Sequence, residues 1–202
     1  MATQVQASEG LEPIDAVGPG DDRRAASRFT ILIRAAKLID GEQDYLCVIR
    51  DVSTKGVKLR LYNNIPTERP FTLELANGER FAVEQVWARD GFAGFRFPDP
   101  VELERLIEVE RGPYPSRKLR LRTRITGQLF AGGDGHGVQV ANISQQGAAV
   151  ICDAFLALDQ LVRLDCPGLP SLYAKVRWRR RPDYGLVFEQ TLAFEQLVKL
   201  SG

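Results

Sequence analysis

The chain has very few residues of the types that most often carry catalysis or bind metals. It contains one histidine, His136, and three cysteines, Cys47, Cys152 and Cys166, which lack the paired spacing of a metal site. A lone histidine has no second ligand of its own kind, and we find no nucleophile and base in a suitable arrangement. We therefore expect neither an enzyme nor a metal-binding protein, and we expect no cofactor.

The chain also lacks a strong excess of charge and a long apolar run. Its 27 Lys and Arg and 26 Asp and Glu residues leave a formal net charge of +1, so the whole molecule does not attract nucleic acid or a membrane strongly. We find no signal segment and no apolar stretch near the roughly 18 residues of a membrane span. Cys47 and Cys166 lie in apolar, strand-like runs, which predicts buried free thiols in a reducing, cytoplasmic compartment.

What the chain does contain is a turn motif that occurs twice, with its copies 91 residues apart (142 − 51). The first copy is Asp51-Val-Ser53-Thr-Lys-Gly56, and the second is Asn142-Ile-Ser144-Gln-Gln-Gly147. The same offset relates Trp87 to Trp178, Gly94 to Gly185, and Phe97 to Phe188. A turn alone can recur by chance, but a turn, a tryptophan, a glycine and a phenylalanine in one register predict a duplicated domain.

The duplication divides the chain into three parts. Residues 1–21 are poor in large apolar groups and carry acidic side chains with no basic one, which predicts a disordered acidic tail. Residues 22–111 form the first predicted domain and residues 112–202 the second. Each is large enough to bury a core of its own.

Both predicted domains read as mainly β. Apolar and polar residues alternate over 57–61, 71–75 and 81–87 and again over 172–178, which is typical of half-buried strands. Trp87 and Trp178 fall on the apolar faces of their strands, so we expect both in the core. Short strands separated by Gly, Asn and Asp turns favour small antiparallel barrels or sandwiches. Helical spacing near 103–107 and 194–198 predicts a short helix at the end of each domain, plugging a barrel or packing between the domains.

Three arginines, Arg23, Arg24 and Arg28, precede the first predicted strand, and Arg28 lies 23 residues before Asp51 (51 − 28). An Arg-x3-Arg pair upstream of Asp-x-Ser-x2-Gly, followed by a strand with Trp87 and a Gly-x-x-Phe strand, resembles the PilZ family. The resemblance covers nearly everything after residue 22, in two tandem copies. It implies two six-stranded antiparallel barrels that bind cyclic di-GMP, a bacterial second messenger.

The resemblance implies a ligand site in the first domain formed by Arg23, Arg24, Arg28, Asp51, Ser53 and Gly56. Arginine forks suit both the O6 and N7 acceptors of guanine and the oxygens of phosphate. Asp51 would accept hydrogen bonds from guanine N–H groups, Ser53 would add a hydroxyl, and Gly56 would permit positive φ or a close backbone approach. Without the arginines, the same motif would read only as a turn whose side chains bond the local backbone.

The corresponding residues of the second domain are Arg117, Arg120, Arg124, Asn142, Ser144 and Gly147. The literal Arg-x3-Arg match, Arg120 to Arg124, places its second arginine 18 residues before Asn142 (142 − 124). Giving Arg120 the role of Arg28 yields a separation of 22 (142 − 120), but Ser116 then stands in for Arg24, unless Arg117 substitutes. We therefore expect this site to be weaker or lost.

These observations favour a cyclic di-GMP receptor that converts ligand binding into a changed domain arrangement or a changed contact with a downstream protein partner. The first alternative is a degenerate protein whose barrels bind another protein without nucleotide. A second alternative, a nucleic-acid-binding barrel, draws on the arginines at 117–124 and 177–181. The near-zero net charge and the acidic tail argue against it. We expect no membrane partner.

Overall fold

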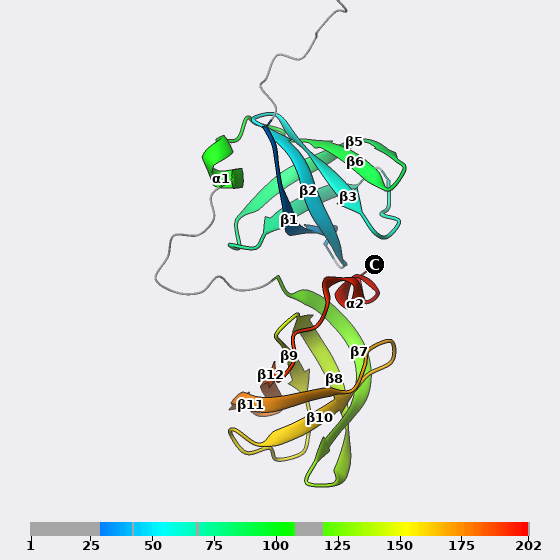
Figure 1. Ribbon diagram of the computed structural model, residues 1–202, viewed down its shortest axis with the longest axis vertical. Helices are drawn as coiled ribbons and strands as arrows, with labels where there is room; N and C mark the ends of the chain where they lie inside the picture. Colours follow the sequence, from blue (N-terminus) through cyan, green and yellow to red (C-terminus); the bar gives the residue numbers. More distant parts are fainter. Residues whose placement is uncertain (1–28, 42, 68, 108–118, 202) are drawn as a thin grey trace, which may run out of the picture.

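The computed structural model describes residues 29–41, 43–67, 69–107 and 119–201, which form two closed barrels stacked end to end (Figure 1). The predicted acidic tail, residues 1–21, lies outside the described residues. Of the predicted domain boundaries, the one between residues 111 and 112 also lies outside them. The prediction of two six-stranded antiparallel barrels in tandem is confirmed.

The first barrel and its helix comprise β1 (Phe29–Ile39), β2 (Asp44–Ser53), β3 (Gly56–Leu61), β4 (Pro70–Leu75), β5 (Arg80–Arg89), β6 (Phe92–Arg96) and α1 (Leu103–Ile107). The strands are hydrogen-bonded in the order β1-β2-β3-β6-β5-β4, and β4 pairs with β1 to close the barrel. Closure leaves no free sheet edge. Alternate side chains point inward, so residues such as Leu59 and Leu73 are fully buried.

The second barrel and its helix comprise β7 (Leu121–Ala131), β8 (Asp134–Ser144), β9 (Gly147–Ile151), β10 (Leu161–Asp165), β11 (Leu172–Arg180), β12 (Asp183–Phe188) and α2 (Phe194–Val198). Their order, β7-β8-β9-β12-β11-β10, reproduces that of the first barrel. The cysteines Cys47, Cys152 and Cys166 are buried free thiols, as the sequence predicts for Cys47 and Cys166. Each helix has five residues, and no helix in the described part of the chain is long and apolar enough to cross a membrane.

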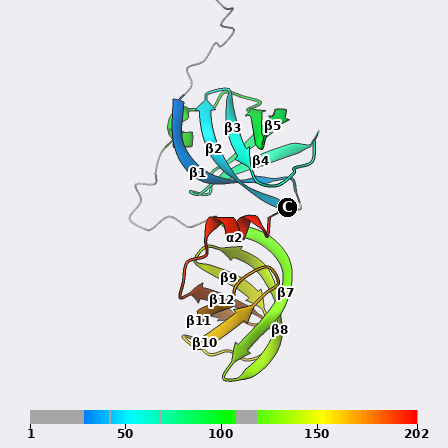
Figure 2. The same ribbon diagram turned by 45° about the vertical axis from the view of Figure 1, so that its right-hand side comes forward.

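The helix α2 packs between the two barrels, which is one of the two placements that its apolar stripe predicts (Figures 1 and 2). Phe194 of α2 meets Tyr62 edge-on, with the ring centroids 5.6 Å apart. Leu46 of β2 is 2% exposed and belongs to the hydrophobic core of the second barrel rather than to that of its own. Asn63, beyond β3, donates a hydrogen bond to the carbonyl of Ser201. The two barrels therefore share an apolar interface.

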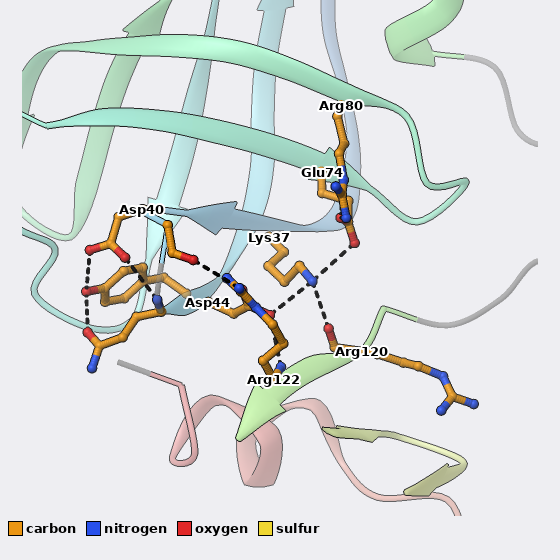
Figure 3. Close-up of polar contacts among 10 residues, drawn as sticks. Lys37, Asp40, Asp44, Glu74, Arg80, Arg120 and Arg122 are labelled. Carbon is orange, nitrogen blue, oxygen red and sulfur yellow. Dashed lines mark hydrogen bonds and ion pairs between the residues drawn. The ribbon is translucent and has the colours of Figure 1, made fainter. Parts of the chain in front are cut away.

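A buried network of charges crosses this interface beside the apolar contact (Figure 3). The Asp44 side chain of β2 is fully buried and accepts hydrogen bonds from Arg122 of β7: Oδ1 from Nε at 2.9 Å and Nη2 at 2.7 Å, and Oδ2 from the backbone N–H at 2.9 Å. Lys37 of β1 lies 3.0 Å from Asp44 Oδ2 and 3.1 Å from Glu74 Oε1. Buried charges require this degree of pairing, because leaving one unpaired costs several kcal/mol.

The network sets the protonation of Asp44. Burial by itself raises the pKa of the Asp44 carboxyl, but the hydrogen bonds from Arg122 and the charge of Lys37 outweigh it, so the net pKa lies below the ordinary value. The hydrogen bonds from Arg122 to Asp44 also raise the pKa of the Arg122 guanidinium. Both groups are therefore charged over the whole neutral range, and the interface contains a permanent ion pair.

We expect Asp44→Asn to lower the free energy of unfolding at pH 7 by about 3–5 kcal/mol, because the change breaks a buried ion pair. A carboxyl with a depressed pKa stabilises the folded state above its unfolded pKa of about 3.9, and this contribution is lost as the pH falls through the folded-state pKa. The gap between wild type and variant in urea denaturation should therefore narrow below about pH 4. Asp134→Asn, an exposed carboxylate in the β7–β8 hairpin, serves as the control. A gap independent of pH would contradict the assignment.

Candidate ligand-binding site

In the first barrel, strand register places four residues from four different strands in one row. Asp51 of β2 is paired with Lys58 of β3, Lys58 with Gly94 of β6, and Gly94 with Trp87 of β5. Neighbouring strands are about 4.8 Å apart, so the row forms a short, continuous strip across four strands. The acidic residue of the turn motif and the tryptophan thus belong to one surface of the barrel.

Two β-bulges turn the ends of this row outward. In β2 the register shifts between Ile49 and Asp51, so Arg50 is an additional residue and Asp51 faces away from the core. In β5 the register shifts between Gln85 and Trp87, with the same effect on Trp87. An additional residue reverses the inward–outward alternation of every residue that follows it.

The expectation that Trp87 and Trp178 are core residues is wrong. Trp87 is 37% exposed and Trp178 is 44% exposed, because each follows the additional residue of a bulge. Each indole packs over a glycine: a Cβ added to Gly94 would lie 2.1 Å from Trp87 Nε1, and one added to Gly185 would lie 1.9 Å from Trp178 Nε1. The glycine of the Gly-x-x-Phe pattern therefore leaves the space in which an exposed tryptophan packs.

The serines of the turn motif bond the local backbone. Ser53 Oγ accepts a hydrogen bond from the N–H of Gly56 at 3.1 Å and donates one to the Gly56 carbonyl at 3.3 Å. Ser144 donates to the Gly147 carbonyl at 3.1 Å and is 3% exposed. These are the contacts of the simple turn that the sequence offered as the alternative interpretation. Both serines shape the turn between their strands.

The glycines of the motif are required by the neighbouring strand, and neither has positive φ. A Cβ added to Gly56 would lie 2.5 Å from the Phe95 carbonyl oxygen of β6, and one added to Gly147 would lie 2.2 Å from the Leu186 carbonyl oxygen of β12. The close approach that the sequence predicts is thus made by backbone of the barrel itself. These distances leave no room for a side chain.

A pocket of about 270 Å³ lies along the row of the first barrel. Asp51, Lys55, Lys58 and Trp87 are among its lining residues. Lys58 Nζ is 4.0 Å from Asp51 Oδ2, and both side chains are partly exposed. An ion pair of this kind contributes little to stability, so a ligand can compete for either partner. The predicted arginines Arg23, Arg24 and Arg28 lie outside the described residues. The described part of β1 does reach the row, because Thr30 is paired with Asp51.

The second barrel forms the same row with different chemistry. Asn142, Ala149, Gly185 and Trp178 are paired in that order across β8, β9, β12 and β11. Alanine thus replaces the Lys58 of the first row, and Gln146 occupies the position of Lys55. The row keeps the amide and the indole, but it has lost both lysines.

Arg120 lies beside Asn142 and donates a hydrogen bond from Nη1 to Asn142 Oδ1 at 3.0 Å. Arg122 is paired with Asn142, as Thr30 is with Asp51. Arg120 precedes Arg122 by two residues, as Arg28 precedes Thr30 in the sequence. Arg120 is therefore the sequence equivalent of Arg28. Arg28 precedes Asp51 by 23 residues, whereas Arg120 precedes Asn142 by 22. The difference arises because the irregular stretch of β1, between Thr30 and Arg34, is one residue longer than that of β7, between Arg122 and Ile125.

The remaining arginines of the second copy are placed differently. Arg124 lies within the irregular part of β7 and lines another pocket, next to Arg122 and Asp44. The literal match of Arg120 to Arg124 therefore does not bring two arginines to Asn142. Arg117 lies outside the described residues. Arg122 is bonded to Asp44 of the first barrel, a structural contact that the sequence analysis did not identify.

Comparison with known families agrees with this geometry in both barrels. The profile of the PilZ domain matches residues 22–111 and again residues 116–201. The chain belongs to the PilZ family. A search of curated proteins finds no match.

Several solved structures contain a chain that is similar to this one. The Borreliella burgdorferi PlzA protein in complex with c-di-GMP is 12% identical, with a TM-score of 0.34 and coverage of 82% of this chain and 85% of that one. The Bacillus subtilis inhibitor of motility, MotI/DgrA, is 15% identical, with a TM-score of 0.35 and coverage of 84% and 94%. YcgR in complex with c-di-GMP from Escherichia coli is 12% identical, with a TM-score of 0.30 and coverage of 83% and 80%.

We expect Gly147→Ala to destabilise the second barrel by about 1–3 kcal/mol, because the new methyl group would overlap the Leu186 carbonyl. Gly137→Ala is the matched control: Gly137 lies in β8, has no positive φ, and has no atom within 4 Å of an added Cβ. Its substitution should change stability by less than about 0.5 kcal/mol. Thermal or urea denaturation measures both. Equal stability of the two variants would show that Gly147 is not needed for strand packing.

Proposed function

We propose that the protein is a cyclic di-GMP receptor, with its principal ligand site on the first barrel. The observation that carries the proposal is the outward row of Asp51, Lys58 and Trp87, which lines a pocket beside the start of β1. This row combines an acceptor for guanine, a cation for phosphate and a flat aromatic surface. Membership of the PilZ family supports the choice of ligand.

Each member of the row suits a different part of the ligand. The Asp51 carboxylate accepts hydrogen bonds from guanine N–H groups, which favours guanine over adenine. Lys58 exchanges its weak contact with Asp51 for phosphate oxygens. The exposed Trp87 indole offers a surface on which a base stacks, and the Arg89 guanidinium, 5.4 Å from its centroid, adds a cation. Trp87 thus joins the site residues expected from the sequence.

The arginines Arg23, Arg24 and Arg28 complete the proposed first site. They precede β1, and β1 pairs with β2 at Thr30 and Asp51, so the first residues of β1 lie beside the pocket. Their forks supply bidentate contacts to guanine O6 and N7 or to phosphate. Ser53 and Gly56 act indirectly, through the shape of the turn.

The second barrel supplies a weaker site for the same ligand. Arg120 and Asn142 already form a hydrogen bond, and Trp178 lies in the same row. The site lacks the lysines of the first, and Asn142 has no charge. Ligand binding at either barrel is converted into a change of domain arrangement or of contact with a protein partner, without a chemical reaction.

A second candidate function, a nucleotide-independent interaction module, is favoured by apolar side chains on the outer face of the second barrel. Leu161, Tyr173 and Val187 are 48–59% exposed. Leu161 and Val187 flank Lys175 on β11, since both are paired with it. Exposed apolar side chains that gather on one face are typical of protein-binding surfaces.

We expect isothermal titration calorimetry to detect cyclic di-GMP binding to wild type, and Asp51→Ala to weaken the tighter site about ten- to hundred-fold. The loss corresponds to a hydrogen bond with a charged acceptor. Asp134→Asn should bind like wild type. Absence of any binding by the intact protein would contradict the receptor function, and a tight complex with a protein partner under those conditions would support the interaction module instead.

The two tryptophans allow the sites to be observed separately, because the chain has only two and each row contains one. Trp178→Phe leaves Trp87 as the sole indole and reports the first site, whereas Trp87→Phe leaves Trp178 and reports the second. Stacking of guanine should quench each indole, and we expect saturation at lower ligand concentration for Trp87. Half-saturation of Trp178 at the lower concentration would reverse the ranking of the sites.

A further inference from the structure

We propose that Lys37 of the first barrel is a positioning residue for Arg120 in the second ligand site. The inference rests on the proposed function, since it concerns how that second site is assembled. It implies that the second site is built by both barrels, whereas the first is built by one. The argument depends on the buried charges at the domain interface (Figure 3).

Lys37 is held by three acceptors. Its side chain is 6% exposed, and Nζ lies 3.0 Å from Asp44 Oδ2 and 3.1 Å from Glu74 Oε1. The third acceptor belongs to the other barrel: Nζ donates to the Arg120 carbonyl at 2.8 Å. An ammonium group has three protons, so each acceptor takes one. The Arg120 carbonyl is therefore part of the solvation of a buried charge.

Arg120 makes contacts in two directions. Its carbonyl faces Lys37 of the first barrel, and its guanidinium donates to Asn142 Oδ1 of the second at 3.0 Å. Figure 3 shows the side chain leading away from the charged network. The first barrel therefore holds the backbone of Arg120, while the Arg120 guanidinium lies beside the row of the second barrel.

A second contact fixes the same short segment. The backbone N–H of Arg122 donates to Asp44 Oδ2 at 2.9 Å, so residues on both sides of Leu121 are held by buried charges of the first barrel. With the backbone held at two points, the guanidinium of Arg120 has a limited range of positions. A positioned arginine loses less conformational entropy when it binds a ligand.

Among the described residues, the second barrel offers the first site no counterpart of Lys37 and Asp44. At the offset of 91, Gln128 and Gly135 stand where the first barrel has Lys37 and Asp44, so the repeat does not reproduce the network. The dependence is consequently one-directional: a change at Lys37 should affect the second site and leave the first unchanged.

The test is Lys37→Met, titrated with cyclic di-GMP in the two single-tryptophan backgrounds. We expect the dissociation constant reported by Trp178 to rise about ten-fold, as for the loss of one charge-assisted hydrogen bond. The value reported by Trp87 should stay within about two-fold of its wild-type level. The matched control is Asn63→Ala, which removes a different interface contact, with Ser201, and leaves Arg120 held.

Three results would overturn the proposal. Equal second-site affinity in wild type and Lys37→Met would show that Lys37 does not position Arg120. An equal loss in Asn63→Ala would show that docking in general, and not Lys37, is responsible. A response of Trp87 but none of Trp178, each in its single-tryptophan background with Lys37 intact, would show that there is no second site to position. The receptor function itself fails only if intact wild type binds no cyclic di-GMP in calorimetry.

If Lys37→Met does not fold, the double variant Lys37→Met with Asp44→Leu removes both buried charges together. Replacing a buried ion pair with apolar side chains is often neutral for stability. Arg122 loses Asp44 in this variant, but its side chain is 49% exposed and still donates to the Gly41 carbonyl at 2.9 Å. Glu74 keeps its contact with Arg80, at 2.7 Å. The double variant should show the same loss at Trp178, and wild-type affinity there would overturn the proposal.

Discussion

The register of the closed barrels, with its β-bulges, is the constraint on which the proposed sites depend. Without the additional residues Arg50 and Val86, Asp51 and Trp87 would point into the core. Each bulge lies directly before the residue of its strand that belongs to the outward row. Its position therefore determines which residue faces outward there. Closure prevents the strands from sliding to remove the bulge, since every strand has two partners. The surface chemistry of the barrel thus follows from backbone pairing.

The two copies share this constraint and differ in what they place on it. The bulges, the turns and the glycine beneath each tryptophan are duplicated, because each is required for a barrel of this register. The lysines of the first row and the network at Lys37 and Asp44 are not duplicated, and the second barrel closes in the same strand order without them. The residues that distinguish the copies are therefore the informative ones for function.

Much of the fold could be predicted from the sequence, and the failures have physical causes. The turn motif and its offset indicated duplication because they encode local geometry. The alternation of 81–87 predicted a buried Trp87, which is wrong because a bulge depends on the partner strand and leaves no mark on its own strand. The choice between Arg120 and Arg124 stayed open for a similar reason. The contact of Asp44 with Arg122 joins residues 78 positions apart, and no spacing rule in the sequence connects them.

The proposed receptor function requires a link between ligand occupancy and domain arrangement, and in our proposal Arg120 provides it. A ligand shifts an arrangement only as far as its contacts differ between the two states. If the barrels separate, the Arg120 carbonyl loses Lys37, and the guanidinium beside Asn142 is no longer held. Because coupling between two equilibria is reciprocal, a ligand that binds the held arginine also strengthens the contact of the barrels. The buried charge of Lys37, which must keep its three acceptors, gives that coupling its energetic basis.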